Sequence, residues 1–306
     1  MEPNAQTRIW PPLVPAQWEE TRRALHMWTQ VIGKVRLALA PLENHWWQVP
    51  LYVDCRELTT SPMPHDGRTV QIDLDLVGHR LAIRCSDGTE RGFALGPASV
   101  AGFHARLTAE LAALGIEAPI WPVPVEVPDP VPFERDREIV AYDADAAQRF
   151  WRVLVQADRV LKRFRAGFLG KASPVHFFWG SFDLAATRFS GRPAPRHPGA
   201  PGVADAVTRE AYSHEVSSAG FWPGGGGVDT ALFYAYAYPE PPGFAQAAVQ
   251  PAEARYDETL REFVLPYDAV RLAPDPDRAL LSFLQSTYEA AADLGGWDRA
   301  ALERAA

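Results

Sequence analysis

The sequence predicts an α+β protein built from two similar halves, each with helix, strands and helix in that order. Three observations lead to this prediction. Apolar residues recur at helical spacing in four segments, other segments alternate apolar and polar residues as strands do, and a proline-rich run separates the two sets. We therefore expect antiparallel sheet packed against helices, with an approximate twofold axis relating the halves.

Four segments have the apolar spacing of an amphipathic helix. They are residues 16–39, 97–114, 143–169 and 276–294. In the first segment the apolar stripe includes Val31, Ile32 and Val35, and in the last it includes Leu280 and Leu284. Each helix is expected to pack one face against a sheet.

Strands are expected between these helices. The runs TVQIDLDL (69–76) and HRLAIRCS (79–86) alternate with period two and predict a hairpin. In the second half, ALFYAYAY (231–238) and EFVLPYDAV (262–270) are predicted as strands that precede the last helix. The two halves therefore share their predicted order of elements.

A proline-rich run is the predicted connection between the halves. Proline has no backbone N–H, so such a run cannot form a helix or a central strand and should extend over the surface. The predicted organisation is a first half over 1–118, a connection over 119–133, and a second half over 134–306 with an insertion at 190–230. An insertion of this length inside a compact domain is often functional.

Two short aromatic strings indicate the internal repeat. His45-Trp46-Trp47 and His176-Phe177-Phe178 each follow a predicted helix, and each is expected to open a strand. In a duplicated fold, a twofold axis would place the two histidines in equivalent positions. The alternative is that any two α+β segments look alike when they are aligned by eye.

The composition is that of an ordinary globular protein, with 47% hydrophobic and 22% charged residues in a chain of 306. The net charge of −8 argues against a nucleic-acid or anionic-membrane partner, which a basic surface would bind. No apolar run reaches the roughly 18 residues that span a bilayer, and no signal peptide is recognised. Cys55 and Cys85 are expected to be free, small buried groups in or beside strands, and the protein to be cytoplasmic.

The common catalytic motifs are absent from the sequence. Gly224 to Gly227 lack the lysine that follows the glycines of a phosphate-binding loop, and no G-x-S-x-G or G-x-G-x-x-G string occurs. His214-Glu215 does not begin a zinc-protease motif, because Ser218 stands where the second histidine would be. The sequence therefore gives no support to these enzyme classes.

Three histidines are candidate metal ligands. His45, His176 and His214 would form an imidazole-rich site with an open coordination position if the fold brings them together, and the ion would be a divalent transition metal. Asp183 and Glu215 are available as carboxylate ligands or bases. The alternative is that each histidine is satisfied in the core or at a strand end, because the spacing does not require a shared site.

The run AYSHEVSSAGFWPGGGG (211–227) is the strongest candidate for a functional segment. We predict that it is an irregular segment covering a small-molecule site between the halves, with glycines that let it fit closely or move. In an enzyme, His214 and Glu215 are the candidate catalytic acid and base. The alternative is a protein that binds a small molecule without chemistry.

An apolar pocket walled by aromatic rings is the second part of this prediction. The residues expected to contact the ligand are Trp46, Trp179, Phe221, Trp222, Gln30 and Lys34. Gln30 and Lys34 are four residues apart, so they share one face of the first helix. The alternative is that the aromatics only pack in the core and that this helix face is an ordinary polar surface.

Several strings together resemble a bacterial family. They are LHMWTQVIGKVRLALAP, NHWWQVPLYV, SPVHFFWGSFDLAATRFSGR and EAYSHEVSSAGFWPGG, and they are distributed over nearly the whole chain. They are similar to the family catalogued as domain of unknown function 5996. The resemblance implies a stand-alone bacterial protein and transfers no activity, cofactor or catalytic residue.

Overall fold

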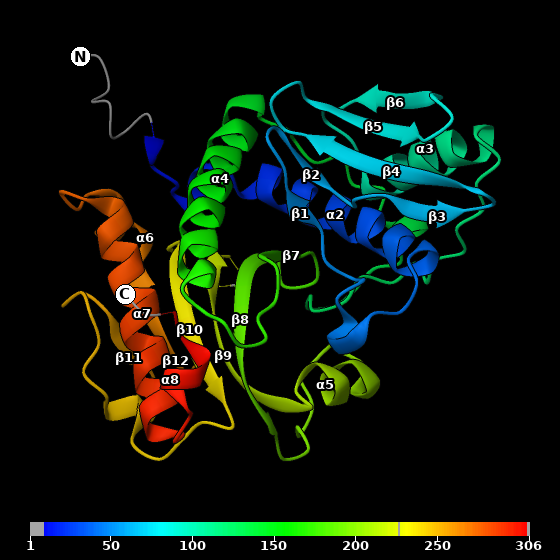
Figure 1. Ribbon diagram of the computed structural model, residues 1–306. Helices are drawn as coiled ribbons and strands as arrows, with labels where there is room; N and C mark the ends of the chain where they lie inside the picture. The colour runs from blue at the N-terminus through cyan, green and yellow to red at the C-terminus, as the bar shows by residue number, and fades with distance from the viewer. Residues whose placement is uncertain (1–8, 226, 305–306) are drawn as a thin grey trace.

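The computed structural model describes residues 9–225 and 227–304, which fold into strands and helices in the order shown in Figure 1. The strands are β1 (Tyr52–Val53), β2 (Glu57–Thr59), β3 (Met63–His65), β4 (Arg68–Asp75), β5 (Arg80–Cys85), β6 (Glu90–Ala94), β7 (His176–Phe178), β8 (Asp183–Pro193), β9 (His214–Trp222), β10 (Leu232–Tyr238), β11 (Arg255–Asp257) and β12 (Glu262–Pro266). The helices are α2 (Glu19–Leu39), α3 (Val100–Ala113), α4 (Ala144–Ala166), α5 (Asp205–Ala211), α6 (Tyr267–Arg271), α7 (Pro276–Leu294) and α8 (Arg299–Leu302).

The strands form two antiparallel sheets, each with six strands among the described residues. The first has the order β1-β2-β4-β5-β6, with β3 also paired to β4, and the second has the order β11-β12-β10-β9-β8-β7. Figure 1 shows the first sheet with α2 and α3 in one part of the molecule and the second sheet with α4 and α7 in the other. The α+β class with antiparallel sheet is confirmed.

The long helices begin and end close to where the apolar spacing predicts them. Helix α7 covers the predicted range, because Asp275 accepts a hydrogen bond from the backbone N–H of Arg278 and Pro276 occupies the first turn. Asp143 caps α4 in the same way, accepting from two backbone N–H groups at 2.9 and 3.1 Å. In α2, the predicted stripe of Val31, Ile32 and Val35 is fully buried.

The two sheets meet at their edges and share one apolar core. Leu51, just before β1, and Phe177 of β7 exchange two backbone hydrogen bonds of 2.9 and 2.8 Å. The buried cluster is continuous from Leu74 and Leu81 of the first sheet to Phe221 and Phe233 of the second. These two hydrogen bonds place strand β7, which begins at His176, next to the segment that follows His45.

The predicted twofold repeat is not confirmed, although each half contributes one six-stranded antiparallel sheet among the described residues. In each half a long helix precedes a run of antiparallel strands, and another helix follows it. His45 does not open a strand as predicted; it lies in a short 3-10 helix (Asn44–Trp46) with a left-handed backbone at φ 60°. His176 does begin β7. The two histidines therefore occupy different local structures.

The proline-rich connection lies against α2, where one side chain fixes it. Gln30 donates a hydrogen bond to the carbonyl of Val125 at 2.7 Å and accepts one from the backbone N–H of Val125 at 2.9 Å. Residues 118–132 contain neither helix nor strand, as predicted. The buried Gln30 thus satisfies both backbone groups of Val125 and fixes the position of its neighbour Glu126.

The prediction for 211–227 is wrong in its secondary structure. Most of this run is strand β9, which pairs with β8 on one side and β10 on the other. The covering segment is instead residues 194–213, which contain α5. Of the four glycines after the strand, Gly226 lies outside the described residues.

Both cysteines are free, and Cys85 is buried at the end of β5, as predicted. Cys55 is exposed in the turn between β1 and β2, so the prediction that it is a buried group is wrong. Among the described residues, no helix combines the length and the apolar character that crossing a bilayer requires.

Candidate functional site

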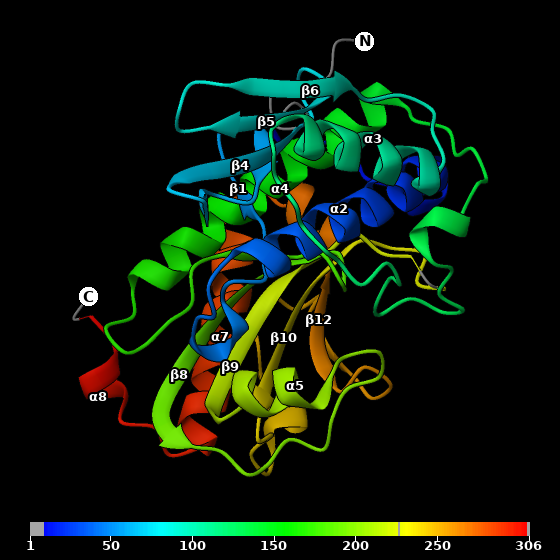
Figure 2. The ribbon, with the colours of Figure 1, turned by 90° about the vertical axis from the view of Figure 1, so that its right-hand side faces the viewer.

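One face of the second sheet forms the floor of a cavity of about 670 Å³. Helices α4 and α7 contact β8, β9 and β10, and Figure 2 shows α7 behind the sheet, on the side away from α5. Phe221 is buried in the core, where its ring contacts those of Phe233 and Tyr267. Figure 2 shows α5 in front of β9 and β10, and Val207, Thr208 and Ala211 of this helix line the cavity. Residues 194–213 therefore form a cover over the open face of the sheet.

The register of the strands determines which side chains form the floor. Ala185, Gly220 and Tyr234 lie opposite one another on β8, β9 and β10, and Ser218 pairs with both Thr187 and Tyr236 in the next row that faces the same way. Alternate residues of a strand share a face, so these rows project towards the cover. The small side chains of β8 and β9 leave the space that becomes the cavity.

Asp183 lies on this floor, and no lysine or arginine among the described residues pairs with it. Its carboxylate accepts hydrogen bonds from the hydroxyl groups of Tyr234 and Ser181. The residue is 7% exposed, and desolvation by burial raises the pKa of its carboxyl to about 6, against the lowering effect of these hydrogen bonds. A carboxyl in this position can change its protonation state near neutral pH.

Gly220 makes the bond between Tyr234 and Asp183 possible. A Cβ atom at Gly220 would lie 2.5 Å from the hydroxyl oxygen of Tyr234 and 2.0 Å from the carbonyl oxygen of Leu184. The tyrosine side chain therefore reaches over Gly220 from β10 to β8. Without the glycine, the phenol could not cross the intervening strand.

Two further carboxyl groups face the same cavity. Glu126 comes from the proline-rich connection, and a Cβ atom on Gly180 would lie 2.0 Å from its Oε1, so the carboxylate packs directly over that glycine. Glu262 comes from β12 and is half-buried. Desolvation, followed by the charge of Asp183, raises the pKa of each glutamate to about 7. Glu126 as a residue is exposed, so solvent screens its charge and its raised pKa represents a smaller free energy than that of Asp183.

His176 lies beside these carboxyls on the cavity wall. It is 1% exposed, and its Nε2 has no hydrogen-bond partner among the described residues. Burial, with the charges of Arg36 and Arg165, lowers its pKa to about 3, so the ring is neutral at ordinary pH. A neutral imidazole has one nitrogen that accepts a hydrogen bond, which a ligand could supply.

A second group of polar side chains lies where the cover meets the sheet edge. Nδ1 of His45 is 3.1 Å from the carbonyl oxygen of Glu210 and 3.3 Å from that of Ala211, so Nδ1 carries the ring proton. Nε2 of His45 accepts from Nζ of Lys171 at 2.7 Å. Burial, followed by the Lys171 charge, lowers the pKa of His45. The neutral imidazole thus links the cover to the rest of the protein.

Aromatic contacts fasten the other end of the cover. The hydroxyl groups of Tyr212, at the end of α5, and Tyr236, on the floor, are 2.8 Å apart. His197 stacks on Tyr212 with ring centroids 4.4 Å apart, and Tyr238 donates a hydrogen bond to the carbonyl of Pro195. These contacts hold residues 194–213 against the sheet.

The three histidines predicted to share a metal do not assemble. The rings of His45 and His214 are 5.7 Å apart, but Trp47 lies between His45 and His176, at 5.4 and 5.8 Å from them. No group of three or more metal-ligating side chains is arranged to hold an ion in the part of the chain that the structure describes. The geometry gives no support to the metal hypothesis.

The predicted acid and base lie outside the cavity lining formed by the described residues. His214 is half-buried at the cavity edge, with Nδ1 3.0 Å from the hydroxyl of Ser213. Glu215 points to the other face of β9, where Arg192 and Ser190 donate to its carboxylate. The side chains of His214 and Glu215 point to opposite faces of the sheet, because adjacent residues of a strand face opposite sides.

Of the six residues predicted to contact a ligand, two line the cavity and four do not. Trp179 and Trp222 line the cavity. Phe221 is buried in the core, and Gln30 holds the proline-rich connection. The other two, Trp46 and Lys34, are absent from the lining formed by the described residues; Lys34 instead lies 5.0 and 5.7 Å from the rings of Trp121 and Trp179. The indole of Trp179 donates to the carbonyl of Val49 and packs on Gly33.

Sequence reasoning singled out neither Glu126, Glu262 nor Tyr234. A usable signal exists in β8, where Asp183, Ala185 and Thr187 share a face that is too small and too polar for a packed core. A buried strand normally carries large apolar residues on its core face. This departure indicates a cavity above the strand.

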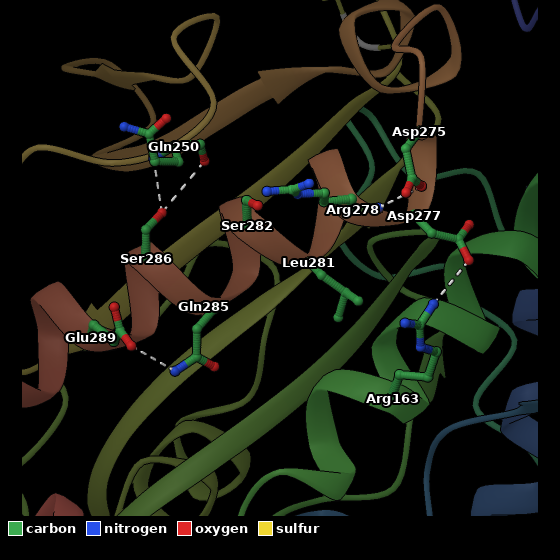
Figure 3. Close-up of a pocket in the computed structure, with 10 residues that line it drawn as sticks. All are labelled: Arg163, Gln250, Asp275, Asp277, Arg278, Leu281, Ser282, Gln285, Ser286 and Glu289. Atoms are coloured by element: carbon green, nitrogen blue, oxygen red, sulfur yellow. Dashed lines mark hydrogen bonds and ion pairs between the residues drawn. The ribbon is translucent and has the colours of Figure 1, made fainter. Parts of the chain in front are cut away.

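A second hollow, on the surface of α7, differs from the cavity in its chemistry. Figure 3 shows that its polar side chains bond mainly to one another: Arg163 pairs with Asp277 at 3.0 Å, and Gln285 donates to Glu289 at 2.9 Å. Charges that are already paired in this way do not require a ligand. The cavity over the second sheet is therefore the stronger candidate site.

Fold and site together define an α+β protein with an aromatic cavity lined by carboxyl groups. The chain belongs to the Family of unknown function (DUF5996), whose model matches residues 10–304. No curated protein and no solved structure matches the chain.

Proposed function

We propose that this protein binds a small organic cation, a molecule with an apolar body and at least one basic nitrogen, in the cavity over the second sheet. The observation that carries the proposal is Asp183, a buried carboxyl that no lysine or arginine neutralises among the described residues. A buried charge is costly unless it is paired. A bound ammonium group would provide the missing partner.

The rest of the cavity fits such a ligand. Trp47, Trp179 and Trp222 supply aromatic walls, and cations bind favourably over aromatic rings. The volume of about 670 Å³ lies within the range of small-molecule pockets. His176 is neutral and adds a hydrogen-bond acceptor rather than a repelling charge.

The binding proposal is tested by calorimetry at pH 8 with amines and their matching alcohols, benzylamine with benzyl alcohol and putrescine with butanediol. We expect at least one amine to bind about tenfold or more tighter than its alcohol, because only the amine pairs with the carboxyls. Asp183→Asn should remove this preference. Glu253→Gln, which removes an exposed carboxylate elsewhere, should leave it unchanged. Equal affinity for every amine and its alcohol would contradict the proposal.

The second candidate function is an enzyme that uses Asp183 as a general acid or base. The observation that favours it is the hydrogen bond from the Tyr234 hydroxyl to Asp183, whose carboxyl has its pKa raised to about 6 by burial. General acids and bases work best when their pKa lies near the working pH.

The two functions are distinguished by the fate of the bound molecule. After incubation of an amine that binds with excess protein in deuterated water, an enzyme is expected to return a ligand with changed mass or carbon-bound deuterium. Asp183→Asn should abolish that change. Recovery of unchanged ligand from the wild-type protein would rule out the enzyme for that ligand and leave the binding function.

A further inference from the structure

The carboxyl groups in the cavity form two separate anionic ends. Asp183 begins β8, and Glu126 lies over Gly180, three residues before Asp183. Glu262 begins β12, which is separated from β8 by β9 and β10 in the sheet. Three strand spacings separate β12 from β8 by about 14 Å across the sheet. Glu262 is also displaced from Asp183 along the strands, because it follows the row of Thr187, Ser218 and Tyr236. Both carboxyls line the same cavity, so a single ligand could contact the two ends.

The floor between the two ends is made of phenol rings. Tyr234 and Tyr236 project from β10, and their rings are nearly parallel, 6.3 Å apart and inclined by 14°. The Tyr234 hydroxyl already donates to Asp183, and the Tyr236 oxygen is bonded to that of Tyr212. The ring faces offer apolar contact to a hydrocarbon chain lying between the carboxyls.

His176 provides an independent indication of a ligand at the Asp183 end. It pairs with Ala185 across β7 and β8, lines the cavity, and is buried with its Nε2 unpartnered among the described residues. Buried polar nitrogens are almost always hydrogen-bonded in folded proteins. In the neutral tautomer with the proton on Nδ1, Nε2 can accept an N–H of a bound ammonium group.

Resting on the organic-cation binding proposed above, we infer that the ligand is a linear aliphatic diamine or polyamine. One ammonium group would lie between Asp183, Glu126 and His176, and a second would pair with Glu262. The methylene chain would cross Tyr234 and Tyr236, which project from β10 between β8 and β12. A monoamine would leave one anionic end without a partner.

Calorimetry at pH 8 with putrescine, butylamine and butanediol tests the inference. We expect putrescine to bind about tenfold or more tighter than butylamine, because each charge-assisted hydrogen bond contributes separately. In Glu262→Gln, a change that conserves side-chain volume, the preference should fall to about threefold or less. Glu253→Gln should retain the wild-type preference and serves as the matched control.

The outcomes separate this inference from the one on which it rests. Equal affinity for putrescine and butylamine, both above that for butanediol, would overturn the diamine assignment and leave organic-cation binding intact. Butanediol binding as tightly as putrescine and butylamine would overturn the diamine assignment, and it would overturn organic-cation binding too if benzyl alcohol also binds as tightly as benzylamine. The absence of binding by any amine would overturn both. A preference for putrescine that survives in folded Glu262→Gln would overturn the role of Glu262, and with it the two-ended site.

Discussion

Asp183→Asn is expected to reduce the dependence of stability on pH between about pH 4 and pH 7, and Glu262, whose pKa burial raises to about 7, retains the rest. Burial raises the folded-state pKa of Asp183 from 3.8 to about 6, so the folded protein binds the proton more tightly than the unfolded chain does. The favourable contribution of the protonated carboxyl is therefore complete below pH 4 and is lost as the pH rises through 6. A rise in pKa from 3.8 to about 6 corresponds to about 3 kcal/mol in the free energy of unfolding.

The asparagine variant removes this ionisation but also changes one hydrogen bond. Its single amide oxygen cannot serve both Tyr234 and Ser181 as the carboxylate does, at a cost of about 1 kcal/mol. We therefore expect the variant to be less stable than wild type at pH 4 and about 1–2 kcal/mol more stable at pH 8.

Urea unfolding at several pH values, with Glu253→Gln as control, measures this effect. The control should follow the wild-type profile, because its carboxylate is exposed. A wild-type slope that persists in Asp183→Asn would show that Asp183 is not the group responsible.

Gly220→Ala is expected to destabilise the protein by about 3 kcal/mol and to separate Tyr234 from Asp183. The added Cβ would meet the carbonyl oxygen of Leu184 at 2.0 Å, and a backbone group in a central strand cannot move aside cheaply. It would also meet the Tyr234 ring at 2.5 Å. The binding preference for amines should decline along with stability.

Gly96→Ala is the matched control for this variant. Nothing lies within 4 Å of a Cβ atom built there, and its φ is not in the left-handed region. We expect a change within about 0.5 kcal/mol, since alanine also restricts the unfolded chain. Thermal and urea unfolding of the two variants under one condition give the comparison. Equal stability of the two would contradict the assigned crowding at Gly220.

The prediction of an irregular segment over residues 211–227 is wrong because most of this run is strand β9. The run from His214 to Trp222 is rich in serine, alanine and glycine, which on local preference indicates an irregular segment. Its backbone becomes a central strand because β8 and β10 supply hydrogen bonds on both sides. Local composition cannot report such long-range partners.

The candidate site was predictable only in part for the same reason. Trp179 and Trp222 line the cavity, and their predicted contact with a ligand stays a prediction. The carboxyls come from three distant segments, at positions 126, 183 and 262, and no spacing along the chain relates them. Gln30 was expected to contact a ligand, but its partner is the backbone of Val125, which lies 95 positions away.

By itself, the sequence determined the α+β class, the positions of α2, α3, α4 and α7, the β4–β5 hairpin and the irregular course of the proline-rich connection. These features follow from apolar periodicity, capping residues and proline chemistry, all of which act between neighbours in the chain. Only the tertiary structure decided that Tyr234 reaches over Gly220 to Asp183, that residues 194–213 cover the sheet, and that the histidines stay apart. Each of these features depends on strand register and on burial of side chains by segments that are distant in the sequence. No local sequence pattern encodes either of these.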